Sequence, residues 1–188
     1  MTSPASSQRA DARRNRDVAI DAAMELLARK PDASMRDVAD AAELGRTTLY
    51  RHFPAREDLI FAIFERIIAE ARVVTAEAVV EGGTPAAILR RLANEIVAIG
   101  ARYKFLEAHR ELSERALKES SGEDEPLLVW IRTAHARGEL APELTPDWVF
   151  QMITALAMSA NEAMQSDEVD QQLAGHLLGE TFVRAFAS

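Results

Sequence analysis

Apolar residues recur along the chain at helical spacing, and glycine and proline mark the breaks between the helices that this spacing predicts. In the segment 34–56, one helical face repeats at i, i+3, i+4 and i+7 through Met35, Val38, Ala39 and Ala42. Ser34 is the expected N-cap of this helix, and Asp37 completes a capping box. A second helix follows Gly45 and is short, because Pro54 disfavours helical geometry at the residue before it.

The second helix of this segment divides into an apolar side and a polar side. Leu49 and Phe53 lie at i and i+4 and are predicted to point into a core. The other positions are predicted to face outward, namely Arg46, Thr47, Thr48, Tyr50, Arg51 and His52. Arginine can pair with guanine, threonine offers a hydroxyl and a methyl group, and tyrosine and histidine can donate to phosphate oxygens. We interpret this face as a DNA-reading surface, and the alternative is a solvated polar face without a partner.

The segment resembles the helix-turn-helix of the tetracycline-repressor (TetR) family of bacterial transcription regulators. The matching runs are Thr48-Leu49-Tyr50, Arg51-His52-Phe53 and Arg56-Glu57-Asp58-Leu59, and with the preceding helix the resemblance covers about residues 16–66. Glu43 departs from the glycine usual at the turn, which costs about 1 kcal/mol if its φ is positive. Ala55 also departs from the usual capping Ser or Asn. The resemblance implies a set of DNA contacts made by Ser34, Arg36, Arg46, Thr47, Thr48, Tyr50, Arg51, His52 and Arg56.

The same periodicity predicts an all-α fold with about nine helices in total. Outside 34–56, helices are expected at about 15–30, 56–80, 85–119, 125–136, 146–165 and 168–186, and Gly100 favours a bend or a division of the long 85–119 region. We expect a disordered tail at 1–12, a three-helix DNA-binding domain at 13–56 and a helical effector-binding and dimerisation domain at 57–188. The basic cluster Arg9, Arg13, Arg14 and Arg16 either follows a DNA phosphate backbone or enters a minor groove, and the alternative is a charged leader without a role.

The last two predicted helices are the most apolar pair and indicate a partner chain. Two helices this apolar at the end of a chain cannot both be covered in one small core, whereas two copies can pair them as a four-helix bundle about a two-fold axis. The TetR resemblance implies the same homodimer interface. The candidate interface residues are Met152, Leu156, Ala160, Ala163, Leu173, Leu177 and Phe182.

Charge and composition limit the class of protein and the kinds of partner that this chain can have. Of 188 residues, 48% are hydrophobic, which excludes a mainly disordered chain, and the absence of cysteine excludes disulfides and thiolate metal sites. The net charge is −8, but residues 1–56 carry 10 basic against 8 acidic residues and residues 57–188 carry 12 against 22. The positive part therefore contains the expected DNA-binding face. Neither a signal peptide nor an apolar run of about 18 residues is found, so we expect a cytoplasmic protein without a membrane partner.

No pattern of catalytic or cofactor chemistry emerges. The four histidines lack metal-ligand spacing, and neither a phosphate loop nor a nucleophile elbow occurs, so we expect no enzyme, no metal and no cofactor. Soft, aromatic and polar residues at semi-buried positions instead suggest a small-molecule pocket, although ordinary core positions are the alternative for each. The candidates are Phe64, Tyr103, His109, Trp130, His135, Phe150, Met158 and Asn161. We expect a largely apolar effector, because these stripes lack the clustered cations that a phosphate requires.

These patterns lead to one functional hypothesis and one competitor. The first is a homodimeric repressor that binds double-stranded operator DNA and is released by a small, largely apolar effector. The second is a helical dimeric scaffold that does not bind DNA. A salt-sensitive shift of duplex DNA would separate the two hypotheses.

Overall fold

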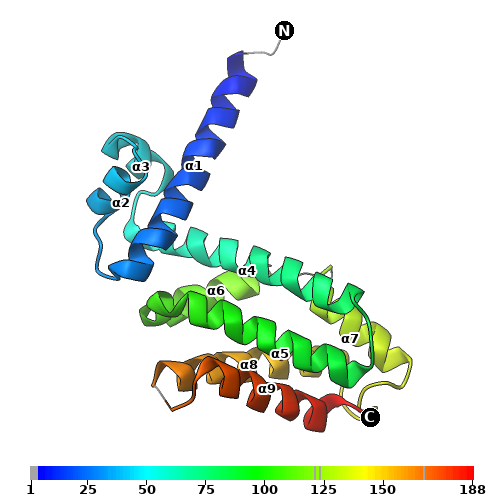
Figure 1. Cartoon of the computed structure of the whole chain (residues 1–188). Coiled ribbons are helices and arrows are strands. Elements are labelled where there is room, and N and C mark those ends of the chain that lie inside the picture. The colour runs from blue at the N-terminus through cyan, green and yellow to red at the C-terminus, as the bar shows by residue number, and fades with distance from the viewer. Residues whose placement is uncertain (1–3, 121, 123, 167) are drawn as a thin grey trace. The chain divides into compact units, whose positions relative to one another are not determined.

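The computed structural model describes residues 4–120, 122, 124–166 and 168–188, and this part of the chain is almost entirely helical (Figure 1). Its elements are α1 (Pro4–Arg29), α2 (Met35–Ala41), α3 (Arg46–His52), α4 (Arg56–Val80), α5 (Pro85–Arg102), the 3-10 helix η1 (Lys104–His109), α6 (Arg110–Ser120), α7 (Pro126–Ala136), α8 (Pro146–Gln165) and α9 (Gln171–Phe186). The expected all-α class is confirmed. No described helix has the length and apolar character needed to cross a bilayer.

Two boundaries differ from the sequence expectation. Helix α1 begins at Pro4, so residues 4–12, expected to be a disordered tail, are helical instead. Proline is compatible with the first turn of a helix, and no helix-breaking residue follows it there. The long 85–119 region divides at Tyr103 rather than at Gly100, which lies inside α5. A Cβ atom at Gly100 would overlap the side chain of Asn161 on α8, so this glycine allows two helices to approach closely.

The contacts of the chain divide it into two compact units. The N-terminal unit comprises Met1–Arg66 with Phe105–Lys118, and the C-terminal unit comprises Ile67–Lys104 with Glu119–Ser188. Helices α4 and α6 therefore each have residues in both units. The first boundary between the units lies ten residues after the domain boundary expected at residue 56. Part of α6 also belongs to the N-terminal unit. Each unit is described by itself below.

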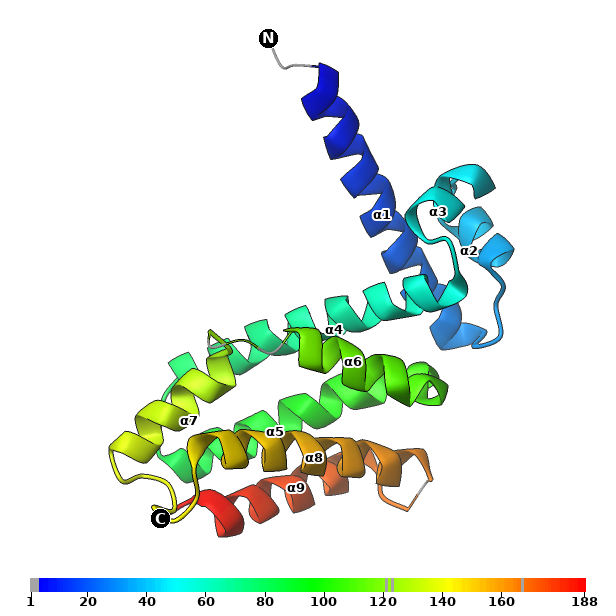
Figure 2. The ribbon, with the colours of Figure 1, turned by 180° about the vertical axis from the view of Figure 1, so that it is seen from behind.

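In the N-terminal unit, α2 and α3 pack beside the C-terminal half of α1 (Figures 1 and 2). Helix α1 contributes fully buried side chains at Ala19, Ile20, Ala23 and Leu27. Two ion pairs join α1 to α4, because Arg66 contacts Asp21 at 3.1 Å and Asp17 at 2.9 Å. All three side chains are partly exposed, so these pairs contribute at most modestly to stability. The apolar burial under α2 and α3 is the main support of this unit.

In the C-terminal unit, α5 and α9 pack closely, and α8 covers both (Figure 2). Gly175 and Gly179 make the α5–α9 approach possible. A Cβ at Gly175 would overlap the side chain of Asn94, and one at Gly179 would lie 3.3 Å from the Cα of Arg90. Arg90 also donates to Glu180 at 2.6 Å, which lowers the pKa of that carboxyl. The two glycines of α9 thus allow its backbone to approach α5 closely.

Arg72 connects α4 to described residues before α7 within the C-terminal unit. Its guanidinium donates to the Ser120 carbonyl at 3.1 Å and pairs with Glu125 at 3.2 Å. Burial raises the pKa of Glu125, and the charge of Arg72 opposes that shift. The buried carboxylate is therefore compensated by a neighbouring cation, as buried charges require.

Candidate nucleic-acid interface

The start of α2 is held by the expected capping box. The Ser34 hydroxyl accepts from the Asp37 N–H at 3.2 Å, and Asp37 Oδ2 accepts from the Ser34 N–H at 2.7 Å. Asp37 also accepts from the Ser34 hydroxyl at 2.8 Å and pairs with Lys30 at 3.3 Å. The hydrogen bonds from Ser34 are the main cause of the lowered pKa of Asp37, which is about 2. The hydroxyl of Ser34 thus already caps a helix, although the residue itself is exposed.

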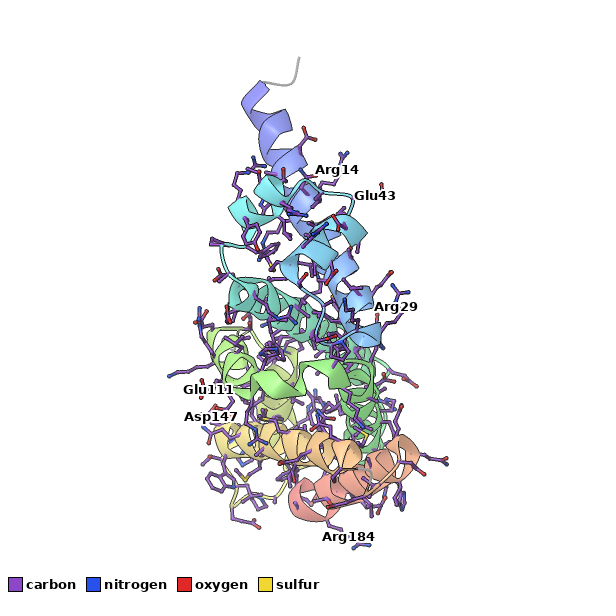
Figure 3. All side chains as sticks on the ribbon, turned by 90° about the vertical axis from the view of Figure 1, so that its left-hand side faces the viewer. Arg14, Arg29, Glu43, Glu111, Asp147 and Arg184 are labelled. Atoms are coloured by element: carbon purple, nitrogen blue, oxygen red, sulfur yellow. The ribbon has the colours of Figure 1, made fainter. Side chains whose placement is uncertain are left out.

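The turn between α2 and α3 depends on Glu43 in the left-handed region, with φ of 53°. The Leu44 N–H donates to the Ala39 carbonyl at 2.9 Å, and the Glu43 N–H donates to the Asp40 carbonyl at 3.2 Å. These two bonds form a Schellman motif, in which glycine is the usual residue at the left-handed position. The backbone strain anticipated for Glu43 is therefore present, and Figure 3 labels this residue at the exposed turn.

Helix α3 has the two-sided character that its sequence predicts. Leu49 is 0% exposed and Phe53 is 1% exposed, which confirms their inward orientation. On the opposite side, Arg46, Thr47 and Arg51 are exposed and Tyr50 is 49% exposed. Thr48 is half-buried. Gly45 serves as N-cap, and it makes no side-chain hydrogen bond to the first turn of this helix.

Two residues of the expected DNA-contact set do not share that outward surface. His52 is half-buried, and its Nε2 is shielded from solvent with no hydrogen-bond partner. Burial, followed by the charges of Arg51 and Arg16, lowers the pKa of His52. Arg56 donates from one guanidinium nitrogen to the Pro31 carbonyl at 3.0 Å and from another to the Ala33 carbonyl. The outward orientation expected for His52 is therefore wrong, because its ring is partly covered. Arg56, expected to contact DNA, instead donates to the loop before α2.

The remaining basic residues differ in their exposure and in whether an acidic residue lies beside them. Arg36 is exposed and lies 3.9 Å from Asp40, one turn along α2. On α1, Arg13 and Arg14 are exposed, and Figure 3 shows Arg14 on the N-terminal unit. Arg16 instead pairs with Glu65 at 3.3 Å and lies over the ring of Phe53, 5.6 Å from its centroid. The sequence pattern placed Arg16 in one cluster with the neighbouring arginines. Its partner Glu65 lies 49 residues away in the chain, so local spacing could not reveal the pair.

The expected effector residues do not form a single group in the described structure. Phe64 and His109 belong to the N-terminal unit, whereas the other six belong to the C-terminal unit. In the latter, Trp130 is buried and the Tyr103 hydroxyl donates to Glu70 at 2.7 Å. Asn161 Oδ1 and His135 Nε2 are buried without hydrogen-bond partners. A cavity of about 300 Å³ lies in the N-terminal unit, and none of its lining residues was in the expected set.

The expected dimer residues differ in exposure. Leu173 and Leu177 on α9 are 44% and 49% exposed, and Met152, Leu156, Ala160 and Ala163 on α8 are half-buried. Phe182 is 0% exposed and belongs to the core of the C-terminal unit, so its assignment to an interface is wrong. It stands four residues after Leu178, on the side of α9 that faces α5, whereas Leu173 and Leu177 lie on another side. Figure 3 shows Arg184 pointing outward from the same helix.

Comparisons with known proteins identify relatives of both units. Residues 19–63 match the model of the family described as bacterial regulatory proteins, tetR family. The HTH-type transcriptional repressor LfrR of Mycolicibacterium smegmatis is 30% identical over 166 residues, which cover 87% of this chain and 85% of that protein. The crystal structure of the TetR-like regulator LfrR from Mycobacterium smegmatis in complex with proflavine has a TM-score of 0.62 at 25% identity and covers 91% of this chain and 95% of that chain. The fatty acid degradation regulator FadR of Bacillus halodurans shares the fold, with a TM-score of 0.69 at 18% identity over 89% of this chain and 97% of its own.

The role of Arg56 as a support for the loop before α2 can be tested by substitution. Arg56→Ala should lower the free energy of unfolding by about 1–3 kcal/mol, because two carbonyl oxygens lose a charged donor. The exposed Arg46→Ala should change it by less than about 0.5 kcal/mol and serves as the control. Denaturant titration followed by circular dichroism measures both. Equal stability of the two variants would contradict the supporting role.

Proposed function

The chain belongs to the TetR family of bacterial transcription regulators, and we propose that it acts in the bacterial cytosol as a homodimeric repressor released from operator DNA by a small, largely apolar effector. We take residues 13–56 as the DNA-binding domain and residues 57–188 as the effector-binding and dimerisation domain. The observation that carries the proposal is the outward side of α3, where four exposed side chains stand opposite the buried Leu49 and Phe53. The relative that is 30% identical is itself named as a repressor, which supports repression over activation.

We assign different roles to the exposed residues of α3. Arg46 and Thr47 lie at the start of the helix, which in helix-turn-helix proteins is the part that contacts base edges in the major groove. Tyr50 and Arg51 lie further along and can donate to phosphate oxygens. Two copies related by a two-fold axis would present two such helices to successive half-sites. The competing hypothesis, a scaffold that does not bind DNA, does not explain why one side of α3 carries both base-contacting and phosphate-contacting residue types.

Substitution of Arg46 and Arg51 should separate base reading from phosphate contact. Arg46→Ala should cost about 1–3 kcal/mol of operator binding and relax the preference at a few base positions. Arg51→Ala should instead weaken binding to every sequence similarly and lower the salt dependence by about one contact. DNA selection with the purified protein, followed by titration at several salt concentrations, measures both effects.

Arg132→Ala is the control for this experiment, because Arg132 is an exposed arginine of the C-terminal unit. It should change neither selectivity nor salt dependence. Identical selectivity profiles for Arg46→Ala and Arg51→Ala would contradict the assigned roles. Failure of the unmodified protein to bind any duplex in a salt-sensitive manner would favour the scaffold hypothesis.

We propose that α8 and α9 form the homodimer interface. Leu173 and Leu177 project from α9 and are about half exposed in the single chain, beside the half-buried Met152, Leu156, Ala160 and Ala163 of α8. Burying leucine side chains of this size contributes about 1.5–3 kcal/mol each. A two-fold axis would double that contribution, because the same surface is used by both copies.

A charge at Leu177 should disrupt dimerisation without disturbing the fold. Leu177→Glu places a carboxylate in an apolar interface twice by symmetry, which should cost several kcal/mol of association. The matched control is Val129→Glu, because Val129 on α7 is 48% exposed and lies outside the proposed interface. Analytical ultracentrifugation should find a folded monomer for the first variant and a dimer for the second. A dimeric Leu177→Glu protein would place the interface elsewhere.

We propose that the effector binds in the C-terminal unit among Trp130, Phe150, Met158 and neighbouring polar groups. Asn161 Oδ1 and His135 Nε2 are buried there without partners, and unsatisfied groups of this kind favour a ligand that can hydrogen-bond to them. Helix α4 has residues in both units. We propose that effector binding shifts the equilibrium between alternative positions of this helix. The relative LfrR has been solved in complex with proflavine, which supports a small-molecule effector for this chain.

Ligand screening by thermal shift should therefore favour apolar molecules with one or two hydrogen-bonding groups over sugar phosphates and nucleotides. A ligand present at about 100 times its Kd should stabilise the protein by about 2.7 kcal/mol. The same ligand should release operator DNA in a gel. Stabilisation by phosphorylated ligands alone would contradict this effector class.

A further inference from the structure

Arg16 of α1 contacts both the end of α3 and the middle of α4. Its guanidinium carbon lies 5.6 Å from the centroid of the Phe53 ring, and its Nη2 lies 3.3 Å from Oε2 of Glu65. Phe53 is the C-cap of α3 and is 1% exposed, so Arg16 lies against a ring that anchors α3 in the core. One side chain therefore joins three helices of the N-terminal unit.

Glu65 lies well beyond the short connection between α3 and α4. Only Pro54 and Ala55 separate Phe53 from Arg56, the first residue of α4, so the two helices already meet at that point. Glu65 stands about 14 Å further along the axis of α4, at about 1.5 Å per residue. A second attachment at that distance fixes the angle between α3 and α4, which the connection alone leaves free.

Arg66, the next residue of α4, attaches the same part of this helix to α1. It pairs with Asp17 at 2.9 Å and with Asp21 at 3.1 Å. The side chains of Arg16 and Glu65 are 42% and 48% exposed, so their pair alone contributes little, whereas a network of several charges holds two helices in one relative placement. Arg66 is also the last residue of its stretch of the N-terminal unit, so the network lies where α4 leaves that unit.

The surroundings of Arg16 differ from those of its basic neighbours on α1. Arg13 and Arg14 are exposed, whereas Arg16 is half-buried between an aromatic ring and a carboxylate. A guanidinium held by two groups of its own protein is not free to follow a phosphate backbone. The contacts of Arg16 therefore favour a role inside the unit.

We infer that Arg16 is a positioning residue: through Phe53 and Glu65 it holds α3 at a fixed angle to α4, and it does not itself contact DNA. The inference rests on the proposed function, because it concerns how α3 is presented to an operator. It also gives a change in the position of α4 a direct route to α3, since Glu65 moves with α4 and Phe53 moves with α3.

Glu65→Gln separates positioning from simple electrostatics by the sign of its effect on DNA affinity. Removal of a carboxylate from the DNA-binding unit reduces the repulsion of phosphates, so simple electrostatics makes the variant bind a selected duplex more tightly. Loss of the link to Arg16 should instead weaken binding about threefold to tenfold. Glu25→Gln is the matched control, because Glu25 is an exposed glutamate of α1, and it should bind at least as tightly as the unmodified chain.

Exchange of the two charges gives a second test of sign. Glu65→Arg places two arginines side by side and should weaken binding, and Arg16→Glu added to it restores an opposite pair and should tighten binding again. Simple electrostatics makes the reverse prediction for both steps, because the first removes a negative charge and the second adds one. Fluorescence anisotropy with the full chain and one labelled duplex measures all of these variants.

The salt dependence tests whether Arg16 touches a phosphate. Arg16→Gln should weaken binding by the same factor as Glu65→Gln and leave the slope of log affinity against log salt unchanged, because no phosphate contact is lost. A slope lowered by about one contact would make Arg16 a DNA contact and overturn the inference. Tighter binding by Glu65→Gln, or by Glu65→Arg than by the exchanged pair, would also overturn it.

A measurement without DNA reports on the link itself. In ¹H–¹⁵N spectra of the full chain, Glu65→Gln should shift the amide resonances of His52 and Phe53 at the end of α3, and Glu25→Gln should leave them in place. Unchanged His52 and Phe53 resonances in Glu65→Gln would overturn the inference. If the unmodified protein binds no duplex DNA, the repressor proposal fails, whereas the spectra still decide whether α4 and α3 are linked.

Discussion

The burial of Leu49 and Phe53 is the constraint on which the DNA-binding surface depends. A helix of seven residues has little stability by itself, so α3 owes both its existence and its orientation to the side that it buries. With those two side chains fixed, the residues on the other side of the helix have no freedom to face anywhere but outward. The Schellman turn at Glu43 then sets the direction in which α3 leaves α2, at the cost of a strained backbone.

The arginines of the N-terminal unit show how one residue type serves two purposes. Arg56 and Arg66 donate to carbonyls or carboxylates of neighbouring segments and so connect α4 to the loop before α2 and to α1. Arg46 and Arg51 point away from the unit and remain available to a partner. The planar guanidinium suits both roles, because it can fork onto two acceptors of the protein or of a nucleic acid. Only the surroundings decide which role a given arginine has.

Helix α9 of the C-terminal unit presents different residues to the core and to solvent. Gly175 and Gly179 let α9 approach α5 closely, so larger apolar residues on the same side, such as Phe182, complete the core. Leu173 and Leu177 lie on another side of the same helix and remain exposed in the single chain. Helix α9 therefore combines an internal contact with two exposed leucines, which belong to the surface that we propose for a second copy. Along the sequence, the acidic excess falls in residues 57–188 and the basic excess in residues 1–56, which contain α3.

The sequence by itself determined the helices, the short α3, the capping box at Ser34 and the inward side of Leu49 and Phe53, because periodicity, caps and proline act over a few neighbouring residues. It also identified the strained turn at Glu43, since the family resemblance marks that position. Only the tertiary structure decided that Arg56 supports a loop, that His52 is half-buried, that Phe182 belongs to the core and that residues of α1, α3, α4 and α6 line a cavity. Each of these depends on partners distant in the chain, and local spacing carries no information about them.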